Sequence, residues 1–261
     1  SAPDEPVDTR TEELPVRWRR APLRLALRES RFGPVVGDHP AFRIGRNGRA
    51  VALRWLGHVP SDEFTPFLDI ARARCWADVR SACERYALPG LNMLCADGDG
   101  RIGSKIAARV PRRPRRAPRD LVLQPAEADA YWAEFVSGDR LPERVDPAEG
   151  VLVSANEEPD AADPPVGFFF SAGDRAERLA ALAAARARIG PDDLAAFQRD
   201  VRQASALAVR DRLLAALDGA GSAADPVVAA IRAWDGDYRA DSAGALAFEL
   251  VVAGLLPRLE R

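Results

Sequence analysis

The stretch Pro89–Pro111, which reads PGLNMLCADGDGRIGSKIAARVP, decides the fold class. Its first part, Leu91–Ala96, is a short apolar run that ends at Asp97–Gly100. Asp-Gly pairs favour tight turns, and Arg101–Gly103 then restarts an apolar pattern. Two apolar segments joined by such a turn are typical of a hairpin. The stretch therefore predicts antiparallel strands in this part of the chain.

The segments around this hairpin continue the β pattern. Leu23–Arg28 alternates apolar and charged residues, and Arg49–Trp55 has the same alternation. A period of two is typical of a half-buried strand. We expect strands at Arg28–Val36, Ala50–Trp55, Leu91–Ala96, Arg101–Ile106 and Val151–Ala155.

Apolar residues recur every three or four positions in other segments, which predicts helices. The strongest such pattern begins at Gly173, and Pro191, followed by two acids, suits the first turn of the next helix. We expect helices at Asp62–Tyr86, Tyr131–Phe135, Gly173–Ile189, Pro191–Leu217, Pro226–Trp234 and Ser242–Leu259. The chain is then α+β, with antiparallel sheets and helices. Residues 1–165 form a β-rich part and residues 166–261 a helical part, both expected to be pieces of one larger domain.

Composition excludes several classes of function. The 261 residues carry 37 basic and 39 acidic side chains, a net charge of −2, which gives no global attraction for nucleic acid or an anionic membrane. Arg109–Arg119 is locally basic, but no aromatic residues alternate with the arginines, which favours a solvated loop. No apolar run reaches the length that spans a bilayer. We expect no nucleic-acid partner and no membrane span.

Histidine and cysteine are scarce. His39 and His58 are the only histidines, too few for a three-histidine metal site and a poor basis for a histidine triad. Cys75, Cys83 and Cys95 lack the spacing of a zinc site or a disulfide framework, so we expect buried small hydrophobic side chains.

Six motifs, in order, resemble the interior of the β chain in the penicillin amidase family of N-terminal-nucleophile hydrolases. The most specific is Pro89–Pro111, where the family reads close to P-x-x-N-x-x-Y-A-D-x-x-G-N-I-G and then I-P-x-R. Arg28–Val36 resembles R-x-T-x-H-G-P-V-I, with Phe32 in place of the histidine. The other matching segments are Ala71–Val79, Gly150–Asn156, Gly173–Leu179, and Trp234–Gly236 with Asp241–Ala245.

The resemblance implies the four-layer αββα fold of these hydrolases. It also implies cleavage of an amide between an acyl group and an amine, as in penicillins, acyl-homoserine lactones or lipopeptides. In that family the nucleophile is the first residue of the β chain, exposed by self-cleavage, and its own α-amine acts as the base.

Ser1 does not fit that nucleophile. The family's nucleophile is followed by Asn and an aromatic residue, whereas Ala2-Pro3 follows here, and Thr11–Leu14 resembles a segment well beyond the nucleophile. We therefore expect the nucleophile outside this chain, no amidase activity in the isolated chain, and two partners: the remaining segments of the same hydrolase and an acyl-amide small molecule.

Asn156 and Arg175 match two site positions of the family. There the Asn donates its side-chain N–H to the oxyanion of the tetrahedral intermediate, which contributes on the order of 3 kcal/mol. The Arg lies near the nucleophile, where a positive charge lowers the pKa of an α-amine. The alternatives are that Asn156 merely ends a strand and that Arg175 pairs with Asp174 or Glu177. We expect both side chains to face one cleft.

Asp163 matches a position near which the family holds a structural calcium ion, aided by a backbone carbonyl near Pro118. Calcium takes six to eight oxygen ligands, and the family's other ligands lie upstream, so an ordinary loop acid is the alternative.

Two further interpretations stay open. The chain can be a degenerate, non-catalytic family member that acts as a scaffold or partner-binding module, which Phe32 favours, or an α+β domain unrelated to amidases. The resemblance implies a periplasmic or secreted location, while the sequence itself leaves a cytoplasmic one open.

Overall fold

The computed structural model describes residues 6–37, 50–113, 122–159, 162, 165–219 and 225–259. The chain divides into two compact units, each assembled from separate stretches. The first unit comprises Ser1–Met93, Lys105–Leu141 and Asp163–Val166, and the second comprises Leu94–Ser104, Pro142–Ala162 and Gly167–Arg261. The compositional boundary expected at residue 165 stays a prediction.

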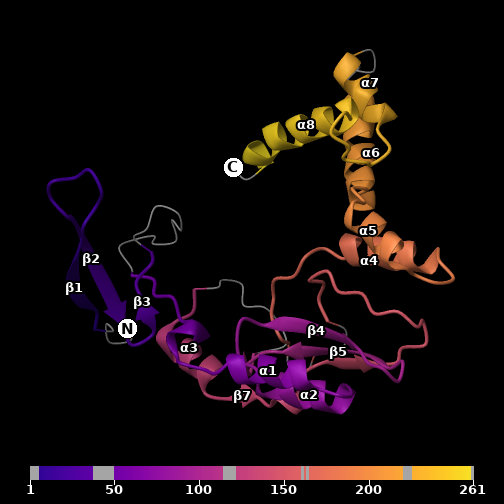
Figure 1. Cartoon of the computed structure of the whole chain (residues 1–261). Helices are drawn as coiled ribbons and strands as arrows, with labels where there is room; N and C mark the ends of the chain where they lie inside the picture. Colours follow the sequence, from indigo (N-terminus) through magenta and orange to yellow (C-terminus); the bar gives the residue numbers. More distant parts are fainter. Residues whose placement is uncertain are drawn as a thin grey trace. The chain divides into compact units, whose positions relative to one another are not determined.

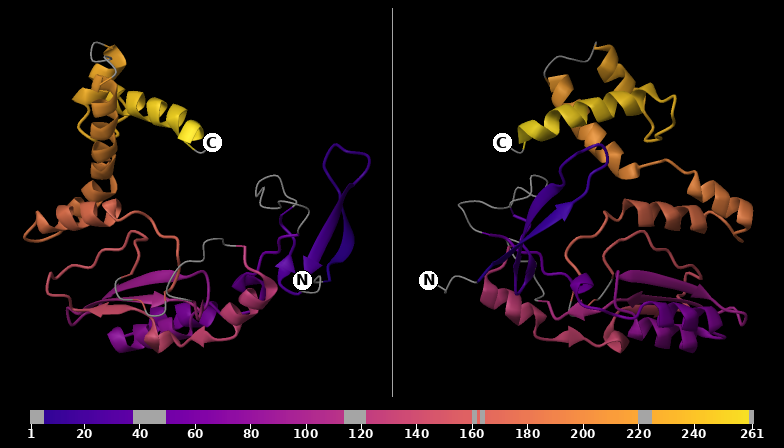
Figure 2. Two further views of the ribbon diagram at one scale, coloured as in Figure 1. Left: turned by 180° about the vertical axis from the view of Figure 1, so that it is seen from behind. Right: turned by 60° about the vertical axis from the view of Figure 1, so that its left-hand side comes forward.

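The first sheet lies near the start of the chain. Strands β1 (Asp8–Leu14) and β2 (Leu23–Ser30) pair antiparallel, from Asp8 opposite Glu29 to Leu14 opposite Leu23, and β3 (Gly33–Pro34) adds to β2. Figure 2 shows β1 and β2 side by side. Gly33 has φ +122°, a backbone conformation that favours glycine and turns the chain back onto β2.

The expected hairpin is confirmed in the second sheet, which has the order β4 (Leu91–Ala96), β5 (Ile102–Ala107) and β8 (Glu143–Val145). The Asp97 carboxylate accepts hydrogen bonds from the amides of Asp99 and Arg101 and so closes the turn. A third, antiparallel pair joins β6 (Val110–Pro111) to β7 (Phe135–Val136). Sheets and helices together make the chain α+β, as expected (Figure 1).

Three of the expected strands need correction. Arg28–Val36 is broken, because β2 ends at Ser30 and the chain turns before β3. Ala50–Trp55 is no strand, and contributes only an isolated bridge between Ala52 and Val35. Val151–Ala155 is not a strand either. Among the described residues, Val151–Ala155 belongs to none of the sheets.

Two expected helices, Asp62–Tyr86 and Pro191–Leu217, are each divided in two, and the one expected at Tyr131–Phe135 is wrong. Asp62–Tyr86 forms α1 (Phe64–Arg72) and α2 (Trp76–Arg85), and the Asp78 carboxylate accepts from the Arg74 amide at the start of α2. Tyr131–Phe135 spans the end of helix α3 (Pro125–Trp132) and the start of β7.

The other helices are α4 (Asp174–Ala184), α5 (Pro191–Gln198), α6 (Ala204–Gly219), α7 (Pro226–Ala233) and α8 (Ala243–Leu259), with short 3-10 turns η1 (Leu56–His58) and η2 (Gly138–Arg140). The expected Pro191–Leu217 helix is thus α5 and α6.

The core of the second unit is formed by α6, α7 and α8 around Trp234. The Trp234 indole N–H donates to the Asp237 carbonyl at 2.9 Å, and its ring packs against Phe248 and Tyr238. Gly236 has φ +91°, which turns the chain directly after the tryptophan. The Trp-Asp-Gly motif is therefore a packing motif in this chain.

The first unit contains a fully buried charge. Lys105, at 0% exposure on β5, is the only lysine in the sequence. Its ammonium donates to the Leu141 carbonyl at 3.3 Å and lies 4.0 Å from Glu84 Oε1 at the end of α2. An ammonium in such a place is tolerated only with partners of this kind.

Replacement of Lys105 by Met is expected to lower the free energy of unfolding by about 1–3 kcal/mol, because the Leu141 carbonyl loses a donor and Glu84 loses a neighbouring cation. Chemical denaturation of the purified protein measures this change. Glu84→Gln and the double variant complete a double-mutant cycle. Strictly additive costs in that cycle would show that Lys105 and Glu84 do not interact.

Candidate functional site

Asn156 lies in a bend of the second unit, directly after the buried Ala155. Its φ of +63° is in the left-handed region, which Asn adopts more readily than most residues. The Asn156 carbonyl accepts a hydrogen bond from the Ser171 amide at 2.8 Å, while the residue itself is exposed. One hydrogen bond thus restrains the backbone at an exposed residue.

Arg175 lies in the first turn of α4 and is exposed. The neighbouring carboxylate of Asp174 accepts from the Ser205 hydroxyl at 2.9 Å. In the part of the chain that the structure describes, Arg175 makes no ion pair with Asp174 or Glu177. The local ion pair considered as the alternative role is therefore not formed.

A second arginine of α4 fixes this helix in place. Arg178 Nε and Nη2 donate to the two carboxylate oxygens of Asp200 at 2.9 and 2.6 Å. These hydrogen bonds hold the pKa of Asp200 below its usual range. Because this fork binds α4 to the segment between α5 and α6, it sets the direction in which the first turn of α4 points.

The structure brings the backbones of the two candidate residues near each other. Ser171, bonded to Asn156, is followed within a few residues by the start of α4. Across the described ranges, no hydrogen bond joins the side chains of Asn156 and Arg175. That both face one cleft stays a prediction.

Three residues considered in the sequence lie outside the described residues: Asp163, Pro118 and Ser1. Among the residues that are described, no three acidic, histidine or cysteine side chains gather closely enough to hold a metal ion. The calcium ion stays a prediction, and no chemical step is assigned to it.

Phe32, which stands where the family has histidine, lies against the guanidinium groups of two arginines. The Arg31 guanidinium lies 4.0 Å and that of Arg54 5.4 Å from the centre of the Phe32 ring. Asp129 of α3 accepts from Arg31 through both carboxylate oxygens and from Arg54 at 3.3 Å. An aromatic face stabilises cations at these distances, so Phe32 has a packing role.

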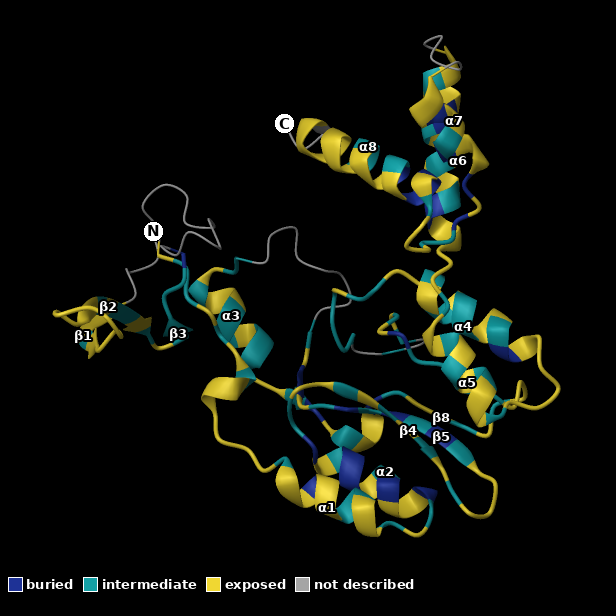
Figure 3. Cartoon of the chain, turned by 45° about the horizontal axis from the view of Figure 1, so that its top comes forward, coloured by how far each residue is buried: buried dark blue, intermediate teal, exposed yellow. Residues whose placement is uncertain are grey.

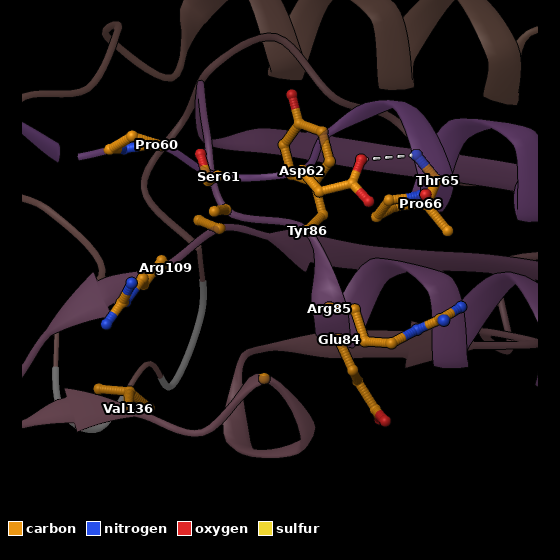
Figure 4. A pocket seen from close by; sticks show the side chains of 13 residues that line it. Pro60, Ser61, Asp62, Thr65, Pro66, Glu84, Arg85, Tyr86, Arg109 and Val136 are labelled. Carbon is orange, nitrogen blue, oxygen red and sulfur yellow. Dashed lines mark hydrogen bonds between the residues drawn. The ribbon is translucent and has the colours of Figure 1, made fainter. Parts of the chain in front are cut away.

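The first unit also contains a hollow of about 410 Å³ that sequence analysis did not identify. Figure 4 shows it between the start of α1 and the end of α2. Asp62 accepts from the Thr65 amide at 3.0 Å, and the hydrogen bonds from Thr65 lower the pKa of Asp62. Burial raises the pKa of Tyr86. The only signal in the sequence was this Asp-x-x-Thr helix start, which is common at helix N-termini.

The polar groups of this hollow are mostly engaged with protein neighbours. Arg85 pairs with Asp69 at 2.7 Å, and the Ser61 hydroxyl donates to Glu63 at 2.7 Å. The Arg109 guanidinium lies 4.3 Å from the centre of the Phe135 ring. The hollow is therefore a polar depression whose arginines are engaged with neighbours outside the lining.

Comparisons with known proteins agree with the fold. The family profile described as penicillin amidase matches residues 2–261. The penicillin acylase 2 proenzyme of Pseudomonas sp. (strain SE83) is 29% identical over 247 residues, which are 90% of this chain and 31% of that protein. The chain thus spans about a third of the length of this curated relative. A thermostable penicillin G acylase from Alcaligenes faecalis has a similar structure, with a TM-score of 0.64 and 20% identity over 90% of this chain and 42% of that chain. The chain therefore has the fold of the N-terminal-nucleophile hydrolases.

The Arg178–Asp200 pair predicts a pH-dependent contribution to stability. The pKa of Asp200 is lower in the folded protein than in the unfolded chain, where it is about 3.9. The pair therefore stabilises the fold fully above the unfolded pKa, and this stabilisation is lost as the pH falls through the pKa of the folded protein. Urea unfolding from pH 7 to pH 3 should show wild type and Asp200→Asn converging at low pH. A constant difference between the two proteins would contradict the pair's contribution.

Proposed function

Because this chain belongs to the penicillin amidase family, we propose that it forms part of an amidohydrolase that cleaves an acyl-amide bond with an N-terminal nucleophile. The observation that carries the proposal is the left-handed, exposed Asn156, fixed through its carbonyl beside the segment that leads into α4. Non-glycine residues held at positive φ cluster at functional sites, where the surrounding structure maintains them.

In this proposal the side-chain N–H of Asn156 donates to the oxyanion that develops when the nucleophile attacks the acyl carbonyl. A donor that is already oriented stabilises the transition state more than the substrate, because it need not reorganise as the charge appears. The contact from the Ser171 amide supports such a role, since it restrains the Asn156 backbone and leaves the amide side chain outside the bond.

Arg175 is proposed as the positive group beside the α-amine of the nucleophile. A nearby cation disfavours the protonated amine, lowers its pKa and keeps it available as a base. The absence of an ion pair with Asp174 or Glu177 among the described residues supports this role, because a carboxylate partner would offset the charge.

The substrate class that we propose is an acyl group joined to an amine, as in penicillins, acyl-homoserine lactones or lipopeptides. The remaining segments of the same hydrolase would supply the nucleophile and the acyl pocket, and calcium, if bound near Asp163, would be structural. The non-catalytic alternative, a scaffold or partner-binding module, stays a prediction.

Replacing Asn156 by Gly in the intact hydrolase tests the oxyanion role. Glycine accepts φ +63° without steric cost, so the change removes the amide and keeps the backbone conformation. We expect kcat for a chromogenic acyl anilide to fall about a hundredfold or more.

The matched control measures thermal unfolding of the same variant, which should be nearly unchanged. If turnover stays at the wild-type rate and only the unfolding temperature falls, Asn156 merely shapes the turn. A wild-type hydrolase without turnover on any acyl anilide of a chain-length series would instead favour the non-catalytic alternative.

Replacing Arg175 by Gln is expected to raise the pKa of the α-amine, because the nearby positive charge is lost. The acid limb of the kcat/KM pH profile should then move to higher pH, toward the ordinary α-amine pKa near 8 and by up to about 1 unit. Arg175→Lys keeps the charge and should leave the limb in place. An unchanged profile in Arg175→Gln would remove Arg175 from the site.

A further inference from the structure

The hollow of the first unit contains a buried phenol without a protein partner. Tyr86 directly follows α2, whose buried residues are dark blue in Figure 3, and it is itself 3% exposed. The Tyr86 ring packs edge-on against Phe67, with the ring centres 5.4 Å apart. Across the described ranges, no group forms a hydrogen bond with the Tyr86 hydroxyl. A buried tyrosine hydroxyl usually has a partner, so this one is available to another molecule.

The Tyr86 hydroxyl opens into the hollow. Within the part of the chain that the structure describes, Glu84 Oε1 is the one fully enclosed side-chain oxygen without a hydrogen bond. The Tyr86 hydroxyl also lacks a hydrogen bond, so it is not fully enclosed, and the hollow is the space that Tyr86 lines. Burial raises the pKa of Tyr86, and the Glu63 carboxylate adds to this effect. The phenol is therefore neutral at pH 7, where it both donates and accepts hydrogen bonds.

Asp62 supplies a negative charge to the same hollow, and Figure 4 shows it with Tyr86 among the lining side chains. Asp62 Oδ1 accepts from the Thr65 amide, and the hydrogen bonds from Thr65 lower the pKa of Asp62, so its carboxylate stays ionised at pH 7. Among the described residues, Asp62 has no ion-pair partner. The two arginines of the lining, Arg85 and Arg109, are engaged with neighbours outside it. The charge left to a ligand in this hollow is therefore negative.

Part of the wall of the hollow is apolar. The side chains that contribute it are those of Pro60, Pro66, Ala87, Ala108 and Val136. Small-molecule sites combine such apolar wall with a few polar groups that fix the orientation of the ligand, and the volume of about 410 Å³ is in their usual range. An ammonium group only donates hydrogen bonds, so it suits an ionised carboxylate beside a phenol that has no donor of its own to accept from.

We propose that the hollow binds a small primary alkylammonium ion. Its ammonium group donates to the Asp62 carboxylate and to the Tyr86 hydroxyl, while its alkyl chain lies against the apolar part of the wall. All residues of this site belong to the first unit, whereas Asn156 and Arg175 belong to the second. The proposal therefore does not rest on the proposed hydrolysis.

Selective labelling of tyrosine tests the site, because this chain contains only three tyrosines. The intact hydrolase is labelled with tyrosine that carries ¹³C at the ring carbons next to the hydroxyl. The NMR signal of Tyr86 is identified by its loss in Tyr86→Phe. n-Butylammonium chloride is then titrated into the protein at pH 7 and constant ionic strength. n-Butanol and sodium butyrate, which have similar chain lengths, serve as the neutral and the anionic probe.

We expect the Tyr86 signal to shift saturably with n-butylammonium and not with the other two probes. The Kd should be about 1–10 mM, because so small a ligand makes few contacts. Asp62→Asn keeps an oxygen that accepts from the Thr65 amide but removes the charge, so the Kd should rise at least about tenfold. Asp99→Asn removes an exposed carboxylate of the turn between β4 and β5 and is the matched control, whose Kd should equal that of wild type.

Four results would overturn the proposal. No shift at concentrations well above the expected Kd would mean that water alone occupies the hollow. An equal shift with n-butanol would mean that charge has no role, and a shift with butyrate would make this a site for anions. An unchanged Kd in Asp62→Asn would mean that the ammonium group does not contact Asp62. Since the readout needs no turnover, a saturable shift in an inactive protein would support the site while counting against the proposed hydrolysis.

Discussion

The ammonium group of Lys105 ties three elements of the first unit together. It reaches from β5 to the Leu141 carbonyl and toward Glu84 at the end of α2. Glycine at position 138 completes this junction, because a Cβ there would lie 2.2 Å from the Glu84 carbonyl oxygen. The free-energy cost of burying an unpaired charge is far larger than the gain from burying a methylene group. Lys105 and its partners must therefore come together in the same folding step. The small core of Val110, Val136 and Leu141 lies beside this junction.

The second unit depends on apolar packing instead. Trp234 lies in the core that α6, α7 and α8 form. The two hydrogen bonds from Arg178 to Asp200 join α4, the helix that carries Arg175, to the segment between α5 and α6. Arg175 is in the first turn of α4, so the position of its side chain depends on how firmly α4 is held. The packing of α4 is therefore as important for the proposed chemistry as Arg175.

Sequence patterns gave the local structure where local chemistry decides it. The Asp97 turn with its flanking strands β4 and β5, the alternating strand β2 and the helices that begin at proline follow from turn residues, periodicity and caps. The strand expected at Val151–Ala155 was wrong, because an apolar pattern alone does not make a strand. The role of Phe32 was equally hidden, since its two arginines and Asp129 come from three separate segments.

By itself, the sequence determined the family, the α+β class and the identity of Asn156 and Arg175 as candidates, because motifs and periodicity are properties of neighbouring residues. Only the tertiary structure decided that Asn156 has a left-handed backbone held by Ser171, that Arg178 rather than Arg175 binds an acid, and that the single lysine is buried. Each of these depends on residues far apart in the sequence. Their contacts form only when the whole chain has paid the entropy of folding, and no local pattern records them.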